Sequence, residues 1–177
     1  LQERKNPLMS IKSLMNYTFV SKYARWIPEK KRRETWNEAV DRVKQMMLQK
    51  YVYGDLENNK EIEEEIEWAY EQMCKKKVLG SQRALQFGGE PIIKHNARIY
   101  NCITSYVDRL KFFQECMFLL LCGCGTGFSV QRHHVAKLPK LLKQKSGSKK
   151  FTIPDSIEGW SDAVGVLVSS YFDQGEL

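Results

Sequence analysis

The chain carries five cysteines, and thiols have the widest chemical reach of its side chains, because a thiolate can bind a metal, attack a substrate or supply electrons by closing a disulfide. They are Cys74, Cys102, Cys116, Cys122 and Cys124. An odd number without the dense spacing of a disulfide scaffold predicts reduced thiols. Cys102 is centred in a polar-flanked run, residues 100–104, where a free cysteine is more often a small buried apolar residue than a reactive group.

Two of these cysteines precede a histidine pair, and the four side chains together suggest a zinc site. Cys122 and Cys124 are followed by His133 and His134. Thiolates and imidazoles are usual zinc ligands, but structural sites pair C-x₂₋₄-C with a comparable second half, which this spacing lacks. Adjacent histidines on a strand would also point to opposite faces. The sequence therefore favours buried thiols and a basic surface pair, and we expect no metal.

Glycines alternate directly after the first of these cysteines, at Gly123, Gly125 and Gly127. Glycine lets a backbone turn tightly or approach a ligand closely. The run is not a dinucleotide fingerprint, which follows a strand and opens a helix, and it lacks the Gly-Lys-Ser/Thr of a phosphate-binding P-loop. A tight turn from helix to strand and a ligand-contacting turn both remain open.

The elements that would position these groups are marked by hydrophobic periodicity. Apolar residues recur at helical spacing in residues 36–47, 62–73 and 157–172, which predicts three helices. A fourth helix, residues 110–121, has almost no polar face and must be buried or shared with a partner. Asp108 is placed to cap its first turn. β-branched and aromatic residues predict strands at 98–106 and 128–131.

Composition and length bound the remaining possibilities. The chain has 177 residues, 42% of them hydrophobic, which suffices for about one globular domain but not for a closed α/β barrel of roughly 200 to 250 residues. A formal charge of +7 suits an anionic partner, although the basic runs at 29–33 and 137–150 are more often solvated faces than a nucleic-acid footprint. No segment approaches a membrane span, and the N-terminus lacks a signal-peptide core, so a cytoplasmic protein without a membrane partner is expected.

Several ordered blocks resemble one known family. From residue 17 onward the chain is similar to the N-terminal part of the large catalytic subunit of ribonucleotide reductases, most closely the adenosylcobalamin-dependent class II enzymes. The blocks that carry the resemblance are residues 23–30 (YARWIPEK), 83–89 (RALQFGG), 96–102 (NARIYNC), 119–123 (LLLCG), 125–130 (GTGFSV) and 158–163 (EGWSDA). Together they cover about residues 17–172 in the family's order.

The resemblance implies an α/β fold with two parts. Residues 1–85 would form a mainly helical N-terminal region. Residues 86–177 would hold the first strands and helices of a ten-stranded α/β barrel, which this chain leaves incomplete. The chain would then be an N-terminal fragment or a split subunit, inactive alone, whose partner is the remaining catalytic portion of the reductase.

The resemblance also implies a chemistry, the reduction of ribonucleotides to 2′-deoxyribonucleotides by a thiyl radical that adenosylcobalamin generates. A pair of cysteines supplies two electrons by closing a disulfide, which a thiol reductant reopens, and Cys102 matches the first of that pair. Asn101 and Gly125 match positions where the backbone approaches the substrate, and Ser81 lies in the first substrate loop. The other cysteines of the reaction and most cobalamin contacts belong to later elements that no part of this chain matches.

An effector site and a dimer follow from the same resemblance. Asp108 matches the residue that contacts the ribose of an ATP or deoxynucleotide effector, and Arg132 with the lysine-rich residues 137–150 would face its phosphates. The helices expected at 110–121 and 157–172 pack across a two-fold axis in dimeric members, so a homodimer is expected.

Two alternatives stay open. A non-catalytic basic module of the same architecture would bind nucleotides or nucleic acid, with a salt-dependent affinity for DNA or RNA. A class I relative would need a separate radical-generating subunit in place of adenosylcobalamin.

Overall fold

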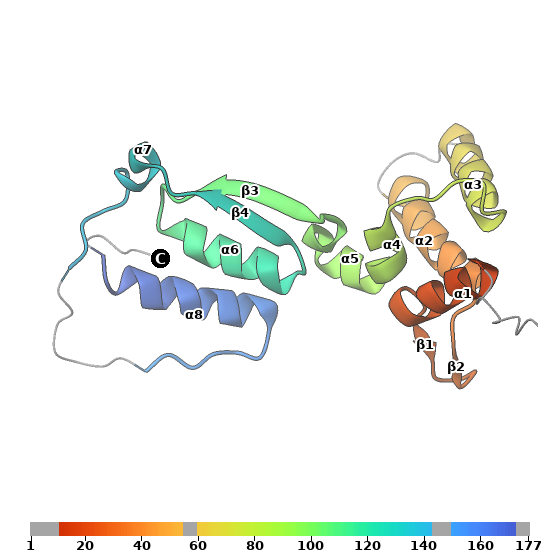
Figure 1. Cartoon of the computed structure of the whole chain (residues 1–177), viewed down its shortest axis with the longest axis horizontal. Helices are drawn as coiled ribbons and strands as arrows, with labels where there is room; N and C mark the ends of the chain where they lie inside the picture. The colour runs from red at the N-terminus through yellow and green to blue at the C-terminus, as the bar shows by residue number, and fades with distance from the viewer. Residues whose placement is uncertain (1–10, 55–59, 143–149, 173–177) are drawn as a thin grey trace, which may run out of the picture. The chain divides into compact units, whose positions relative to one another are not determined.

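The structure is a computed structural model that describes residues 11–54, 60–142 and 150–172. The chain divides into two compact units, Leu1–Ile99 and Tyr100–Leu177, and each is described by itself (Figure 1). The boundary expected after residue 85 lies inside a helix of the first unit. Within the described ranges, none of the helices combines the length and apolar character needed to cross a bilayer.

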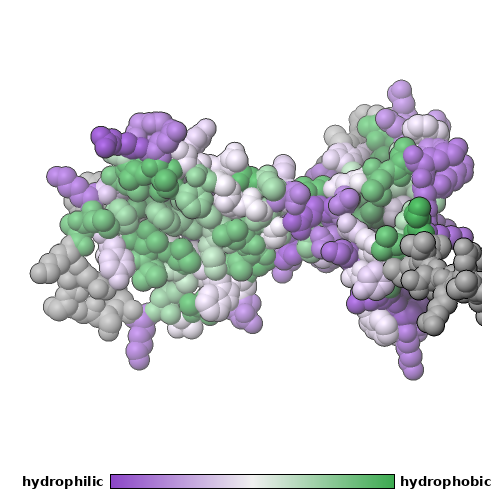
Figure 2. All heavy atoms as spheres, viewed as in Figure 1, coloured by the Kyte–Doolittle hydropathy of each residue, from purple (hydrophilic) through white to green (hydrophobic). Residues whose placement is uncertain are grey.

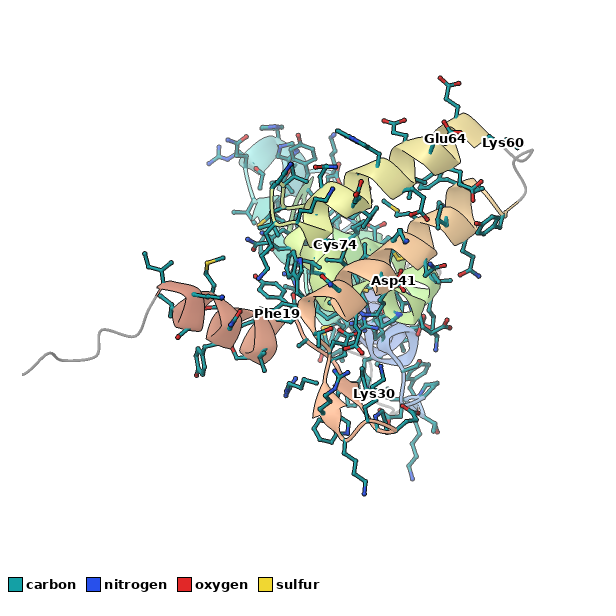
Figure 3. The ribbon with its side chains drawn as sticks, turned by 90° about the vertical axis from the view of Figure 1, so that its right-hand side faces the viewer. Phe19, Lys30, Asp41, Lys60, Glu64 and Cys74 are labelled. Carbon is teal, nitrogen blue, oxygen red and sulfur yellow. The ribbon has the colours of Figure 1, made fainter. Side chains whose placement is uncertain are left out.

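The first unit is helical over its described residues, with a short hairpin between α1 and α2. Its elements are α1 (Ile11–Lys22), β1 (Trp26–Ile27), β2 (Arg32–Arg33), α2 (Trp36–Tyr51), α3 (Lys60–Cys74), α4 (Gln82–Phe87), α5 (Glu90–Lys94) and the 3₁₀ helix η1 (Asn96–Ile99). The helices predicted at 36–47 and 62–73 are confirmed as α2 and α3, each somewhat longer than its apolar pattern. They lie side by side in Figure 3, where Asp41 marks α2 and Cys74 marks the end of α3.

The core of this unit is built on the apolar face of α2. That face buries residues that recur at helical spacing, namely Ala39, Val40, Val43 and Met46. The buried side chains that meet them come from α3, α4 and α5, namely Met73, Ala84, Leu85 and Ile92. Thr35 begins α2 with a capping box, in which its hydroxyl accepts from the Glu38 amide and the Glu38 side chain accepts from the Thr35 amide. The cap satisfies two backbone donors where the apolar face begins.

A buried ion pair ties α2 to the end of α4. The Glu34 carboxylate, 8% exposed, accepts from Arg42 Nε at 2.8 Å and from Nη2 at 2.9 Å. Arg42 also donates from Nη1 to the Gly88 carbonyl at 2.9 Å and from Nη2 to the Leu85 carbonyl at 2.8 Å. Burial alone would raise the pKa of Glu34, but hydrogen bonds from Arg42 and from the Arg25 amide lower it below its ordinary value. The pair therefore stays charged near neutral pH and satisfies two carbonyls at the end of a short helix.

Replacing Arg42 tests this pair. In Arg42→Ala the Glu34 carboxylate stays buried without its partner, so we expect the free energy of unfolding to fall by about 3–5 kcal/mol. The matched control is Arg32→Ala, which removes an exposed pair with Glu38 and should cost far less. Urea unfolding followed by circular dichroism measures both losses, and equal losses would contradict the role of the buried pair.

The ion pair of Glu34 and Arg42 also predicts that the free energy of unfolding depends on pH. Because folding lowers the pKa of Glu34, its contribution to stability is present above the ordinary glutamate pKa and is lost as the pH falls through the folded value. The difference in unfolding free energy between the wild-type chain and Arg42→Ala should therefore shrink at acid pH. A difference that stays constant down to the acid transition would show that Glu34 is not the group involved.

The second unit is built on a strand–helix–strand motif. β3 (Cys102–Tyr106) leads through α6 (Lys111–Leu121) to β4 (Gly125–Ser129), and the two strands pair in parallel. α7 (Arg132–Val135) follows β4, and α8 (Ile157–Ser169) packs against α6. In Figure 1, α6 lies between the strand pair and α8. One face of the strands is therefore covered by a helix, and the other is open.

The helices α6 and α8 confirm the predictions at 110–121 and 157–172, although α8 ends somewhat earlier than its apolar pattern. α6 is less buried than its composition suggested. Phe112 is its buried residue, whereas Leu120 is 50% exposed, and Trp160 of α8 is 47% exposed. Hydrophobic side chains gather over this part of the unit in Figure 2. The apolar surface of both helices is thus open to a partner.

Both predicted strands are displaced. The strand predicted at 98–106 begins only at Cys102, because residues 96–99 form the turn of η1. The strand predicted at 128–131 is wrong in its bounds, because β4 starts at Gly125 and its glycines pair with β3. Strand propensity does not predict a strand at these glycines. They join the sheet because their backbone pairs with a neighbouring strand, whatever the side-chain type.

The predicted cap of α6 is also wrong. The cap residue is Leu110, which makes no side-chain hydrogen bond to the helix. The Asp108 carboxylate instead accepts from Arg109 Nη1 at 2.8 Å, and Arg109 also pairs with Glu115. A nearby guanidinium therefore engages the carboxylate that the sequence suggested for the helix start.

Candidate functional site

The strands β3 and β4 present one bare face. Along β3, Cys102, Thr104 and Tyr106 are exposed and alternate with half-buried residues, because successive side chains of a strand point to opposite faces. In β4, Gly125 pairs with Cys102 and Gly127 pairs with Thr104. Neither glycine has a side chain to cover its neighbour, so a ligand can approach the strand backbones on this face.

Three expected substrate residues meet at one end of this face. Cys102 is exposed and begins β3. The Gly125 amide donates to the Asn101 carbonyl at 2.8 Å, which holds the start of β4 beside the start of β3. A Cβ at position 125 would lie 3.6 Å from Cys102 Sγ and 3.7 Å from the Asn101 oxygen. The fold thus brings together Cys102, Asn101 and Gly125 from two separate segments, while their roles stay predictions.

The turn between α6 and β4 divides the glycine motif into two parts. Gly123 has a φ of +91°, which glycine adopts without strain, and it makes the tight turn. Gly125 and Gly127 lie in the strand beyond that turn. The cysteines on either side of Gly123 are buried, as the sequence favoured, and Cys124 Sγ donates to the Tyr100 carbonyl at 3.4 Å. The turn and the ligand-accessible positions are therefore different glycines.

The histidine pair lies on α7, not on a strand. The rings of His133 and His134 are 3.9 Å apart, and the His134 ring stacks on Tyr106 with centroids 4.4 Å apart. The expectation of opposite faces is therefore wrong, because a short helix follows β4. Across the described ranges, no group of three or more histidine, cysteine or carboxylate side chains could hold a metal ion.

Ser81 lies in the first unit, at the start of α4. Its hydroxyl caps the helix by accepting from the Ala84 amide at 3.2 Å. A hydroxyl that accepts one hydrogen bond still has a proton to donate, so the cap and a substrate contact are compatible. The predicted substrate contact of Ser81 stays a prediction.

Asp108 and Arg132 follow the C-terminal ends of β3 and β4. Asp108 is half-buried, whereas Arg132 is exposed and begins α7. Partial burial and two neighbouring basic groups lower the pKa of His134, while Asp108 acts in the opposite direction. The Asp108 carboxylate therefore lies within electrostatic range of α7. Residues 143–149 of the predicted phosphate-binding stretch lie outside the described residues.

A cleft of about 500 Å³ runs beside β3, between the strand and the helices α6 and α8. Its walls include three consecutive residues of β3, Ile103, Thr104 and Ser105, and Thr126 of β4. Strands of parallel sheets are normally covered on both faces and paired at their edges. Among the described residues, β3 pairs with β4 alone.

Sequence comparison relates the chain to known proteins. The family model described as ribonucleotide reductase alpha domain matches residues 1–90. Adenosylcobalamin-dependent ribonucleoside-triphosphate reductases of Lactobacillus delbrueckii subsp. bulgaricus and of Lactobacillus leichmannii are each 24% identical to this chain over 89% of its length. The chain spans 29% of the length of these relatives.

A solved structure shares the fold. The crystal structure of a B12-dependent, class II ribonucleotide reductase matches 88% of this chain and 29% of its own chain, with a TM-score of 0.70 and 22% identity. The mixed helix and strand architecture expected from the sequence is confirmed by this likeness. Because the family model covers half of the chain, the chain belongs to the ribonucleotide reductase family.

Proposed function

We propose that this chain is the N-terminal part, or a separately encoded subunit, of a class II ribonucleotide reductase that reduces ribonucleotides to 2′-deoxyribonucleotides. The observation that carries the proposal is the exposed Cys102 thiol on a bare, glycine-lined strand face, in a chain of the reductase family. Cys102 serves as the first thiol of the reducing pair. Asn101, Gly125 and Ser81 contact the substrate.

Two features of the second unit support its completion by another polypeptide segment. A two-stranded parallel sheet is not stable alone and normally has both faces covered. Here one face is bare, and among the described residues β3 pairs with β4 alone. Further strands from the remaining catalytic portion would pair with the free edges of this sheet, as in a ten-stranded barrel, and would leave the face beside Cys102 open to the substrate. The matched relatives are long enough to supply them, since the chain spans 29% of their length, and this chain alone is expected to be inactive.

The proposed reaction takes its electrons and protons from a pair of thiols. Replacing a 2′ hydroxyl by hydrogen takes two electrons and two protons and releases water, and two thiols supply both as they become a disulfide. Cys102 provides one thiol, and a cysteine of the remaining portion provides the other. The exposure of Cys102 leaves its sulfur accessible to the substrate and to the thiol reductant that reopens the disulfide.

Adenosylcobalamin is the proposed cofactor because it is named for the relatives. When bound, it would supply the radical that starts the reaction. The bare face beside Cys102 fits this arrangement, since a thiol that reacts with groups held by another segment must be uncovered in this chain. We place most cofactor contacts in the remaining catalytic portion, while this chain presents Cys102 and the backbone around it.

The C-terminal ends of β3 and β4 form the proposed effector site. Asp108 contacts the ribose of an ATP or deoxynucleotide effector, and Arg132 contacts its phosphates. The helices α6 and α8 form the proposed homodimer contact, since they expose Leu120, Trp160 and Leu167 at 50%, 47% and 60%. Burying these side chains across a two-fold axis would remove apolar surface from water.

Fragment complementation tests the proposal. The chain is mixed with a polypeptide that supplies the rest of the reductase, a ribonucleotide, a dithiol and adenosylcobalamin. We expect 2′-deoxyribonucleotide only when both polypeptides and the cofactor are present. Product that requires a separate radical-generating subunit instead would favour the class I relative. If no deoxynucleotide forms and the chain binds DNA or RNA with a salt-dependent affinity, the proposed enzymatic function is refuted and a binding module is favoured.

A further inference from the structure

A ring stack joins the end of β3 to α7. Tyr106 is the last residue of β3, and the His134 ring lies on it at 4.4 Å between centroids and 26° between planes. Next to this contact, the Val107 amide donates to the Ser129 carbonyl at 3.0 Å, which extends the pairing of the two strands. The His133 ring then contacts His134 from within α7. Figure 1 shows α7 just beyond the arrowhead of β3.

The helix that carries Arg132 is short and unburied in the part of the chain that the structure describes. α7 has four residues, none of them buried, and the side chain of its cap residue Gln131 makes no capping hydrogen bond, although the Gln131 amide donates to Ser129 Oγ at 3.4 Å. A helix this short is not stable without tertiary contacts. Stacked aromatic rings stabilise a contact beyond the area they bury, so the stack is a substantial contact for so short a helix.

The stack also joins the two segments that carry the residues of the proposed effector site. Asp108 follows Tyr106 by two positions, and Arg132 precedes His134 by two positions. Fixing one ring on the other therefore fixes the segment of Arg132 beside the segment of Asp108. A cation that is held in place loses less conformational entropy on binding a phosphate than one on a frayed segment.

We propose that Tyr106 and His134 are positioning residues, which hold α7 against the end of β3 and thereby strengthen binding of a phosphate-bearing nucleotide by Arg132. The positioning of α7 stands on the geometry of the second unit alone. The nucleotide part of the proposal rests on the proposed function.

The charges around the stack give it a pH dependence. Partial burial, His133 and Lys137 lower the pKa of His134, and Asp108 acts against them. His134 Nδ1 is buried and has no hydrogen-bond partner among the described residues, which also disfavours a second proton. Because the folded pKa lies below the ordinary histidine value of about 6.5, the stack is fully favoured above that pH and weakens as the pH falls below it.

Three variants of the whole chain test the positioning role by amide hydrogen exchange. Tyr106→Leu removes the ring, and we expect the amides of residues 134–136 to exchange about two- to tenfold faster, the factor that corresponds to ~0.5–1.5 kcal/mol. Tyr106→Phe keeps the ring and should restore slow exchange. His134→Phe keeps the stack but cannot be protonated, so it should abolish the loss of protection, corrected for the intrinsic exchange rate at each pH, that we expect of the wild-type chain from pH 7 to pH 5.5. Unchanged exchange in Tyr106→Leu would overturn the proposal.

Calorimetric titration of the same variants with ATP and the four deoxynucleoside triphosphates tests the nucleotide part. We expect Tyr106→Leu to weaken binding by about two- to tenfold and Tyr106→Phe to leave it within about twofold of wild type. Faster exchange without any nucleotide binding, even by the wild-type chain joined to the rest of the reductase, would refute the effector site and leave the positioning of α7 standing. Equal nucleotide affinity in all variants would refute the link between the stack and Arg132.

Discussion

Cys102→Ser should reduce turnover of the complemented reductase to background. The substitution is nearly isosteric at an exposed position, so the fold should be unchanged. A serine hydroxyl cannot form a disulfide, so no second thiol can complete the two-electron transfer. We expect at least a ~10³-fold fall in the steady-state rate of deoxynucleotide formation, about 4 kcal/mol of lost transition-state stabilisation.

The control for this variant is Cys116→Ser. Cys116 lies on α6, is half-buried and has no proposed chemical role, so its replacement should leave the rate within about threefold of wild type. Circular dichroism of both variants checks that the fold is retained. Continued multiple turnovers by Cys102→Ser would remove Cys102 from the reducing pair.

Gly125→Ala should lower the activity of the complemented enzyme without lowering the stability of the chain. The new Cβ would make ordinary van der Waals contacts, 3.6 Å from Cys102 Sγ and 3.7 Å from the Asn101 carbonyl oxygen. Alanine also costs about 0.5–1 kcal/mol less than glycine inside a strand, so the chain should be as stable as wild type or slightly more stable. The methyl group, however, occupies the bare face beside the thiol, and we expect kcat/KM of the complemented enzyme to fall by about 10²-fold.

The comparison variant is Gly127→Ala, which makes the same chemical change on the same strand. Its Cβ would meet Thr104 Cγ2 at 3.7 Å, away from Cys102. We expect a clearly smaller loss of kcat/KM than in Gly125→Ala, at a similar unfolding free energy. Equal activity losses in the two variants, or a destabilised Gly125→Ala chain, would contradict close substrate approach at position 125.

The helices were predictable because their apolar residues repeat at the spacing that one buried face requires. The predictions for α2, α3 and α8 succeeded on that ground. Helix ends were harder to predict, since they depend on caps: Thr35 caps α2 with its side chain, whereas Leu110 begins α6 without one. Asp108 had the right residue type for a cap, but its neighbour Arg109 competes for the carboxylate.

The strand bounds and the histidine contacts could not be predicted from local sequence. Gly125 and Gly127 have low strand propensity, and they join β4 because β3 offers them backbone partners. The stack of His134 on Tyr106 joins two segments separated by α6 and β4, so no sequence spacing reveals it. Long-range pairing decides both features.

The candidate site was predictable in part, through the resemblance of residues 96–102 and 125–130 to the reductase family. Composition and spacing alone favoured a buried structural thiol at Cys102, but the structure exposes that side chain. The register that sets Gly125 beside Cys102 comes from the parallel pairing of β3 with β4. The roles of Ser81, Asp108 and Arg132 stay predictions.

The central claim is that Cys102 supplies one thiol of the reducing pair in a larger reductase. A single turnover of the complemented enzyme without external reductant tests it most directly, with peptide mass spectrometry of the quenched, alkylated protein. We expect one disulfide per deoxynucleotide formed, joining Cys102 to a cysteine of the remaining catalytic portion, and no such link when substrate is omitted. Deoxynucleotide formed in stoichiometric amount while Cys102 is recovered as a free, alkylated thiol would contradict the claim.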